Sequence, residues 1–216
     1  MEGVFTTVYL ARADASVSEA TWRRLYNEAT PQRQAKADRL RFERDKRLCL
    51  AAEALLRRAL KENGLEKYTV LTQKGGKPYL EGNPLYFNLS HSGDYALCAI
   101  SSAPVGCDIE ASATPDLRLA QRFFCPEENQ WIQAGQNKAQ QDHRFYRLWT
   151  LKESFVKATG QGLQLPLNAF CFNFSTEVPI LQGQNQWHFK EYSLDGYHCA
   201  VCAQTVQISA LNSVCL

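Results

Sequence analysis

Two short stretches of this sequence concentrate the side chains that could do chemistry. The first carries two carboxylates, Asp108 and Glu110, in an apolar run that is expected to form a strand. Residues two apart share one face of a strand, so these carboxylates would repel each other unless a cation lay between them. Mg²⁺ prefers a few carboxylates together with phosphate oxygens and water. A solvent-facing strand surface remains the alternative for these two residues alone.

The second stretch is an expected helix that Gly160 and Gly162 close. On a helical wheel Lys152 falls in the middle of the apolar face, Glu153 falls on its edge, and Lys157 follows one turn later. A lysine among core residues is costly unless it is paired. We therefore predict that Lys152 is shielded from solvent and within salt-bridge reach of an anion. An ordinary Glu–Lys pair on an amphipathic helix is the alternative.

Length and composition limit the classes of protein to which this chain could belong. The chain has 216 residues, 45% of them hydrophobic, which suits one globular unit or two domains of about 100 residues. The net charge of +2 gives no charge-based argument for nucleic-acid binding. The sequence has no apolar run of about 18 residues that would span a membrane and no basic segment before an apolar core at its start. We therefore expect a cytoplasmic protein.

Eight cysteines are scattered along the chain, and the pair Cys199 and Cys202 has the spacing of a metal or redox motif. This pair falls in an expected strand, where residues three apart point to opposite faces and could not share a metal. We therefore predict that the cysteines are small, reduced core residues.

Periodicity and turn signals divide the chain into two halves at residues 103 and 104. Each half runs from a strand through helices to further strands, which predicts a duplicated α+β unit with a cleft where the halves meet. The expected elements of the first half begin with a strand over 4–11, a helix that starts with a capping box at Ser16, and a second helix that starts at Pro31. A helix over 43–62 and strands over 85–90 and 95–100 follow. Those of the second half are a strand over 105–110, helices over 116–123, 126–134 and 143–159, and strands over 170–174, 187–192 and 197–208.

The stretch Gly106–Glu110 followed by Trp149–Lys157 resembles the signature of the 4′-phosphopantetheinyl transferases. Gly76–Pro78 and Phe87–Ser92 match that family's upstream motifs in the same order. At this length the chain is similar to the surfactin-type, pseudo-dimeric branch. The resemblance implies two similar α+β subdomains related by pseudo-twofold symmetry, with the active site in the cleft between them. Residues 1–103 would form the coenzyme A side, and residues 104–216 would carry the metal site and the docking surface for the carrier protein.

The same resemblance implies a Mg²⁺-dependent holo-[carrier-protein] synthase. Such an enzyme moves the 4′-phosphopantetheine arm of coenzyme A onto a serine of an apo acyl or peptidyl carrier protein and releases 3′,5′-ADP. By the family's positions, Asp108, Glu110 and Glu153 would hold Mg²⁺, and Glu153 is also a candidate for accepting the serine proton. Lys152 and Lys157 would be catalytic and face the phosphates. Further contacts with coenzyme A would come from Arg47, Lys77, Ser90 and His91.

Two other classes of function stay open: a metal-dependent phosphodiesterase acting on another nucleotide, and an inactive coenzyme A binder. The expected partners are coenzyme A and apo carrier domains, with no nucleic acid and no membrane. We expect a monomer, because two lobes in one chain complete the cleft. Residues 112–135 mix apolar side chains with Arg118 and Arg122, which suits an acidic carrier helix, unless the phenylalanines there are all core. The sequence does not identify the carrier or its pathway in fatty acid, polyketide or nonribosomal peptide synthesis.

Overall fold

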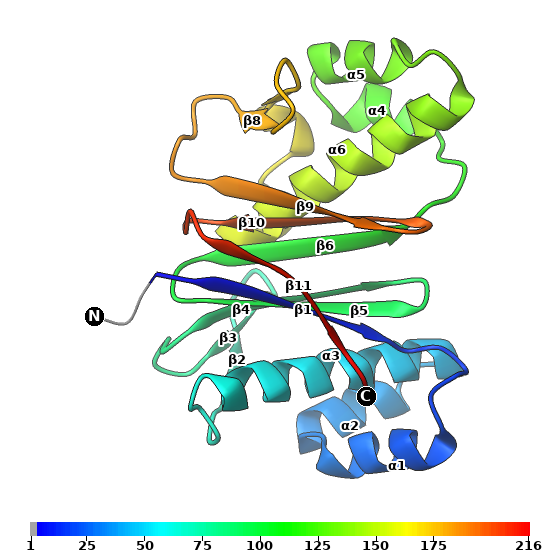
Figure 1. Ribbon diagram of the computed structural model, residues 1–216. Helices are drawn as coiled ribbons and strands as arrows, with labels where there is room; N and C mark the ends of the chain where they lie inside the picture. The colour runs from blue at the N-terminus through cyan, green and yellow to red at the C-terminus, as the bar shows by residue number, and fades with distance from the viewer. Residues whose placement is uncertain (1–3) are drawn as a thin grey trace.

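The computed structural model describes residues 4–216, and its centre is a pair of β-sheets packed face to face. Helices cover the outer face of each sheet, so the molecule has four layers in the order helices, sheet, sheet, helices (Figure 1). Each sheet with its helices forms one lobe. The predicted architecture of two similar α+β subdomains is therefore confirmed.

The first lobe is built on a four-stranded sheet in the order β11-β1-β5-β4. β1 pairs in parallel with β11, and the other neighbours are antiparallel. Three helices lie on its outer face, and the longest of them, α3, packs along β5. The elements of this lobe are β1 (Thr6–Arg12), α1 (Glu19–Glu28), α2 (Pro31–Asp38), α3 (Glu43–Glu62), β2 (Val70–Thr72), β3 (Pro78–Leu80), β4 (Tyr86–Ser92), β5 (Tyr95–Ser101) and β11 (Ile208–Val214).

The second lobe is built on an antiparallel three-stranded sheet in the order β6-β10-β9. The long helix α6 packs across β6 and β10. Its elements are β6 (Val105–Ala111), α4 (Arg118–Phe123), α5 (Pro126–Gln133), α6 (Lys138–Thr159), the 3₁₀ turns η1 (Gly162–Gln164) and η2 (Leu167–Ala169), β7 (Phe172–Asn173), β8 (Ile180–Leu181), β9 (His188–Leu194) and β10 (Tyr197–Ala203). Within residues 4–216, no helix combines the length and apolar character that crossing a membrane requires.

Local sequence explains where the helices begin and end. The side chains of Ser18, Thr30 and Asn137 each accept a backbone N–H from three residues further on, which satisfies a donor that a helix start leaves free. The first helix is thus capped by Ser18 and not by the predicted Ser16. Asn137 starts α6 five residues before the predicted position. Gly160, at φ +72°, ends it in the left-handed conformation that glycine adopts without strain.

Strand alternation separates three cores. Odd-numbered residues of β6, such as Cys107 and Ile109, face the first sheet and join the core between the sheets. Cys199 lies in that same core, whereas Cys202 lies in the core beneath α6. The prediction that these two sulfurs point to opposite faces is therefore confirmed.

Two predictions about the second half are wrong. The expected strand over 197–208 is two strands, because β10 ends at Ala203 and the chain crosses to the other sheet. There β11 pairs with β1, so the segment 104–216 supplies an edge strand to the first lobe. The cysteines are not all reduced, because Cys125 and Cys171 form a disulfide that links the start of α5 to the residue before β7. Their separation of 46 residues left no local pattern to indicate the pairing.

Candidate active site

The site forms where α6 lies directly against β6, and Gly106 makes this contact possible. A Cβ atom on Gly106 would overlap the backbone of α6 at Ser154 O and Ala158 N. Because a backbone cannot move aside as a flexible side chain does, any larger residue at this position would push α6 away from β6. The close approach brings the side chains of β6 and of the last two turns of α6 into one group.

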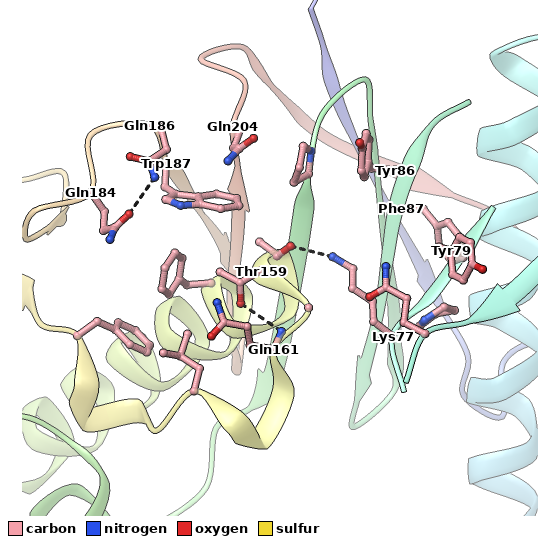
Figure 2. Close-up of a pocket in the computed structure, with 18 of the residues that line it drawn as sticks. Lys77, Tyr79, Tyr86, Phe87, Thr159, Gln161, Gln184, Gln186, Trp187 and Gln204 are labelled. Atoms are coloured by element: carbon pink, nitrogen blue, oxygen red, sulfur yellow. Dashed lines mark hydrogen bonds between the residues drawn. The ribbon is translucent and has the colours of Figure 1, made fainter. Parts of the chain in front are cut away.

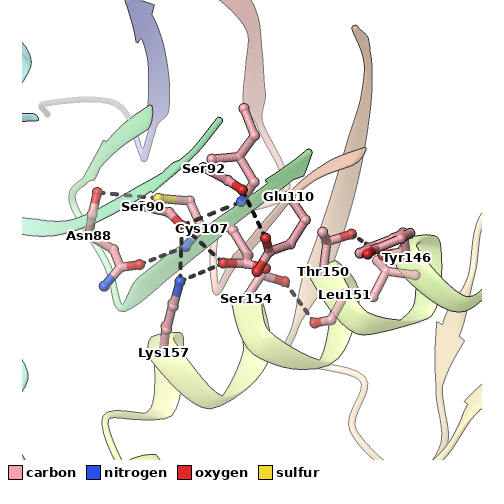
Figure 3. A network of polar contacts seen from close by, with 12 residues as sticks. Asn88, Ser90, Ser92, Cys107, Glu110, Tyr146, Thr150, Leu151, Ser154 and Lys157 are labelled. Carbon is pink, nitrogen blue, oxygen red and sulfur yellow. Dashed lines mark hydrogen bonds and ion pairs between the residues drawn. The ribbon is translucent and has the colours of Figure 1, made fainter. Parts of the chain in front are cut away.

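Asp108, on β6, is at the centre of that group. Lys157 Nζ lies 2.6 Å from Asp108 Oδ1, and Ser90 Oγ donates to the same oxygen over 2.9 Å. The Lys157 ammonium also donates to Ser90 Oγ at 3.1 Å. Two residues further on, Ser92 Oγ donates to Glu110 Oε2 over 3.0 Å. Figure 3 shows Ser90 and Ser92 of β4, Glu110 of β6 and Lys157 of α6 meeting here.

The site holds more negative charge than its lysine offsets. Burial and the nearby Asp108 raise the pKa of Glu153, and the same two causes, joined by Glu153 itself, raise the pKa of Glu110. Burial alone would lower the pKa of Lys157, but the combined effects of Asp108, Cys107 and Glu153 outweigh burial, and the pKa is raised. Asp108, Glu110 and Glu153 place three carboxylates near one another, and a bound cation would relieve their mutual repulsion.

The surroundings of one oxygen of Asp108 also favour a bound cation. Asp108 is 2% exposed, and within residues 4–216 its Oδ2 atom has no hydrogen-bond partner. A buried carboxylate oxygen is normally satisfied by a donor or a metal. The oxygen-only donor set of Asp108, Glu110 and Glu153 fits Mg²⁺, which prefers carboxylates and keeps sites for water and phosphate oxygens.

Glu153 and Lys157 line a cavity of about 820 Å³ between the lobes. The first lobe contributes Gly75 to Pro78 and the middle of β4, and the second contributes α6 and the segment 162–168. Lys77 lies at this boundary, where its Nζ donates to Val105 O at 3.1 Å and to Ala158 O at 2.9 Å. Burial lowers its pKa to about 8.

Lys77 also lines a second cavity of about 600 Å³ (Figure 2). Glutamine side chains supply much of its polar lining, among them Gln161, Gln184 and Gln204, and aromatic residues such as Trp187 supply apolar walls. Within residues 4–216 no carboxylate lines this second cavity. The chemistry is therefore assigned to the larger one.

The structure brings five of the predicted site residues together, namely Ser90, Asp108, Glu110, Glu153 and Lys157, and holds Lys77 at the edge of their cavity. Lys152 is not among them. It is 0% exposed, and its Nζ lies 2.8 Å from Glu128 Oε2. The prediction that Lys152 is shielded and paired with an anion is confirmed, but the expected contact with phosphates is corrected, because the ammonium points into the core beneath α6.

Arg47 and His91 also lie apart from the carboxylates. Arg47 pairs with Glu19 and stacks over Trp22, 5.7 Å from the ring centroid. His91 is exposed on the face of β4 opposite Ser90, because successive strand residues point to opposite sides. Neighbouring groups displace part of the water around the ring of His91, and this desolvation, together with the nearby Lys36, lowers the pKa of His91. These basic groups lie on the helical side of the first lobe, so only an extended ligand could contact them and the carboxylates together.

Sequence reasoning missed three residues of the site and its support. Asn88 and Ser92 contact β6 beside Ser90, and their alternation along β4 was a signal that could have identified them. Glu128, the partner of Lys152, also accepts the backbone N–H groups of Cys125 and Phe172. Its position in the first turn of α5 looked like an ordinary favourable interaction with the helix dipole.

The fold and this site define a two-lobed α+β protein with an acidic, lysine-containing centre suited to phosphoryl transfer. Family models for the N-terminal part of 4′-phosphopantetheinyl transferases and for the 4′-phosphopantetheinyl transferase superfamily match residues 16–103 and 104–202, respectively. A curated relative, the 4′-phosphopantetheinyl transferase Sfp of Bacillus subtilis (strain 168), is 34% identical over 91% of both chains. The chain belongs to the 4′-phosphopantetheinyl transferase superfamily.

Other relatives are similar over slightly less of the chain. The 4′-phosphopantetheinyl transferase psf-1 of Bacillus pumilus is 36% identical over 80% of this chain and 78% of its own. The L-aminoadipate-semialdehyde dehydrogenase-phosphopantetheinyl transferase of Xenopus laevis is 30% identical over 84% of this chain and 70% of its own. Among solved structures, the holo-[acyl-carrier-protein] synthase of Thermotoga maritima superposes with a TM-score of 0.40 and 21% identity, over 47% of this chain and 62% of that one.

Proposed function

We propose that this site transfers the 4′-phosphopantetheine arm of coenzyme A to a serine of an apo carrier protein, with Mg²⁺ held by Asp108, Glu110 and Glu153. The observation that carries the proposal is the group of three carboxylates beside an inter-lobe cavity, in a chain of this family. When bound, Mg²⁺ would offset negative charge on the diphosphate as its phosphoanhydride bond breaks. The Oδ2 atom of Asp108, which has no hydrogen-bond partner among the described residues, supports a role for Asp108 as a metal ligand.

Each side chain has a distinct part in the transfer. The serine oxygen attacks the phosphorus that carries the pantetheine arm, and 3′,5′-ADP leaves with the electron pair of the broken P–O bond. Glu153 accepts the serine proton, because its side chain lines the cavity that the serine must enter. Lys157, held by Asp108, lies beside the diphosphate and stabilises the leaving group.

Coenzyme A would extend from the carboxylates across the first lobe. Lys77 and Ser90 border the diphosphate, whereas Arg47 and His91 on the helical side of β4 and α3 would meet the distant 3′-phosphate. The length of coenzyme A explains why these basic groups need not contact the metal site. Their separation supports an extended ligand over a compact nucleotide.

The carrier protein would dock on the second lobe. Arg122 and Phe123 line the same cavity as Glu153 and Lys157, and Arg118 and Leu119 are exposed beside them. A basic and apolar surface next to the reacting group fits an acidic amphipathic helix that presents a serine. Because both walls of the cavity come from one chain, a monomer suffices. We place the enzyme in the cytoplasm, where coenzyme A and carrier proteins meet.

The test is a reaction of the purified protein with coenzyme A and an apo carrier protein, followed by intact mass analysis. We expect the carrier to gain one phosphopantetheine arm, and excess EDTA to stop the reaction. Asp108→Ala and Glu110→Ala should each abolish transfer. Hydrolysis of coenzyme A with no change in the carrier would support a phosphodiesterase instead. Binding of coenzyme A with no reaction would support an inactive binder.

A further inference from the structure

The outer edge of β6 is closed by side chains and not by another strand. β6 is an edge strand whose only ladder runs to β10, within residues 4–216. On its other side, the N–H groups of Cys107, Ile109 and Ala111 point away from that ladder. They donate to Asn88 Oδ1 at 2.9 Å, Ser90 Oγ at 3.4 Å and Ser92 Oγ at 3.0 Å, respectively. Figure 3 shows these β4 side chains along β6.

This arrangement joins the two lobes and orients the hydroxyl groups. A serine hydroxyl has one hydrogen and two lone pairs. Because Ser92 Oγ accepts the N–H of Ala111, its own hydrogen is directed elsewhere, and Glu110 Oε2 lies 3.0 Å away to accept it. Ser90 Oγ is constrained in the same way and donates to Asp108 Oδ1 at 2.9 Å. Asn88 closes the same edge but contacts no carboxylate within residues 4–216.

Asp108 and Glu110 differ in the number of side chains that form hydrogen bonds or ion pairs with them. Asp108 is held by both Lys157 and Ser90. Glu110 has a longer side chain, and within residues 4–216 its carboxylate has a single hydrogen-bond partner, Ser92. Without Ser92, the metal itself would have to restrict the rotation of the Glu110 side chain. The conformational entropy lost in this way would weaken metal binding.

We propose that Ser92 is a positioning residue that fixes one oxygen of Glu110 and so leaves the other oriented toward a divalent cation. Ser92 acts through Glu110 and needs no contact with coenzyme A or the carrier. The inference rests on the proposed function, because it assumes that Glu110 is a metal ligand. This role also explains why every second residue from Asn88 to Ser92 on β4 is polar. These side chains join the two lobes, and the serines among them also orient the carboxylates of β6.

The test measures metal binding by the full chain without coenzyme A or carrier. Mn²⁺ accepts the same oxygen ligands as Mg²⁺, and its free form is counted by electron paramagnetic resonance. We expect Ser92→Ala to raise the Kd for Mn²⁺ by about tenfold. Ser92→Thr keeps the hydroxyl on a strand-compatible side chain and should restore the Kd to within about threefold of the wild-type value. At saturating Mg²⁺, Ser92→Ala should recover most of its kcat.

Asn88→Ala is the matched control, because it opens the same edge of β6 without removing a donor to a carboxylate. It should lower the free energy of unfolding while leaving the Kd for Mn²⁺ near that of the wild type. If Ser92→Ala binds Mn²⁺ as tightly as the wild type, or if Asn88→Ala weakens binding equally, Ser92 has only a structural role. A wild-type protein that binds no Mn²⁺ would overturn the proposed metal site itself.

Discussion

Lys152 and Lys157 are five residues apart on α6, yet their ammonium groups lie in opposite surroundings. Lys157 faces β6 and pairs with Asp108 in the active site. Lys152 points into the core, where it donates to Leu167 O at 2.7 Å and Phe170 O at 2.6 Å and pairs with Glu128. Its partners hold the segment that forms one wall of the inter-lobe cavity. The two lysines of one motif therefore have different environments, Lys157 among the carboxylates of β6 and Lys152 in the core beneath α6.

We predict that Lys152→Met lowers the free energy of unfolding by about 3–5 kcal/mol, because it leaves the buried Glu128 carboxylate without its cation. Lys152→Met combined with Glu128→Gln should regain much of this loss, since neither remaining group is charged. Urea unfolding measures both. The KM for coenzyme A of the double variant should stay near the wild-type value, and a large increase would instead indicate direct contact between Lys152 and phosphate.

Glu110 should make the stability of the metal-free protein depend on pH. Burial and Asp108 raise its pKa above the ordinary value of 4.5, so the folded state binds this proton more tightly than the unfolded chain. Ionised Glu110 therefore lowers the free energy of unfolding at neutral pH. This destabilisation disappears as the pH falls through the raised pKa toward 4.5. In EDTA, Glu110→Gln should therefore melt at a higher temperature than the wild type at pH 7. The two should melt alike near pH 4, and a difference that does not change with pH would contradict this account.

At the scale of elements, the site depends on how closely α6 approaches β6. Gly106 allows the approach, and it also explains why the carboxylate motif begins with glycine. We predict that Gly106→Ala destabilises the protein by about 1–3 kcal/mol through overpacking and abolishes most transfer by separating Lys157 from Asp108. Denaturant unfolding and carrier labelling measure the two effects.

Gly183→Ala is a control for that change. Gly183 has φ +71° but open space around its Cβ position, so only backbone strain is introduced. It should lose about 1 kcal/mol of stability and keep its activity. Equal activity losses in both variants would contradict a specific role for the contact between α6 and β6.

The disulfide between Cys125 and Cys171 is a second link between elements. It closes a loop that contains α6, so its removal increases the conformational freedom of the unfolded chain. We predict that Cys125→Ser with Cys171→Ser lowers the free energy of unfolding by about 2–4 kcal/mol. Calorimetry under oxidising and reducing conditions checks this. Cys215→Ser changes an exposed cysteine outside the link and should have no effect.

At the scale of the whole molecule, two lobes of one chain enclose the cavity and leave the basic surface near Arg122 accessible. We predict that Arg122→Glu raises the KM for the carrier protein about tenfold, because it places a negative charge against an acidic helix, and leaves coenzyme A affinity unchanged. Arg118→Glu should have a smaller effect, since Arg118 is already paired with Asp116. Lys67→Glu, an exposed reversal on the first lobe, is the control. A reversal at Arg122 that weakens only coenzyme A binding, or an active species that is an obligate trimer, would contradict the docking model.

Local sequence patterns predicted the long helices, most of the long strands and the faces on which their side chains lie. Periods of two and of about 3.6 residues put Asp108 and Glu110 on one strand face and Lys152 on an apolar helix face, and both placements are confirmed. The resemblance carried by Gly106–Glu110 and Trp149–Lys157 identified the family. These features are local, because a few neighbouring residues set the direction of each side chain.

Which distant groups meet depends on how whole segments pack together, and local patterns do not contain this information. β11 pairs with β1, Cys125 pairs with Cys171, and Lys152 takes Glu128 as its partner, although no periodicity relates these positions. The same holds for the row from Asn88 to Ser92, whose polar alternation is visible in the sequence but whose partner strand is not. An edge N–H or a buried charge can be satisfied by many groups, and the packing of whole layers selects one of them.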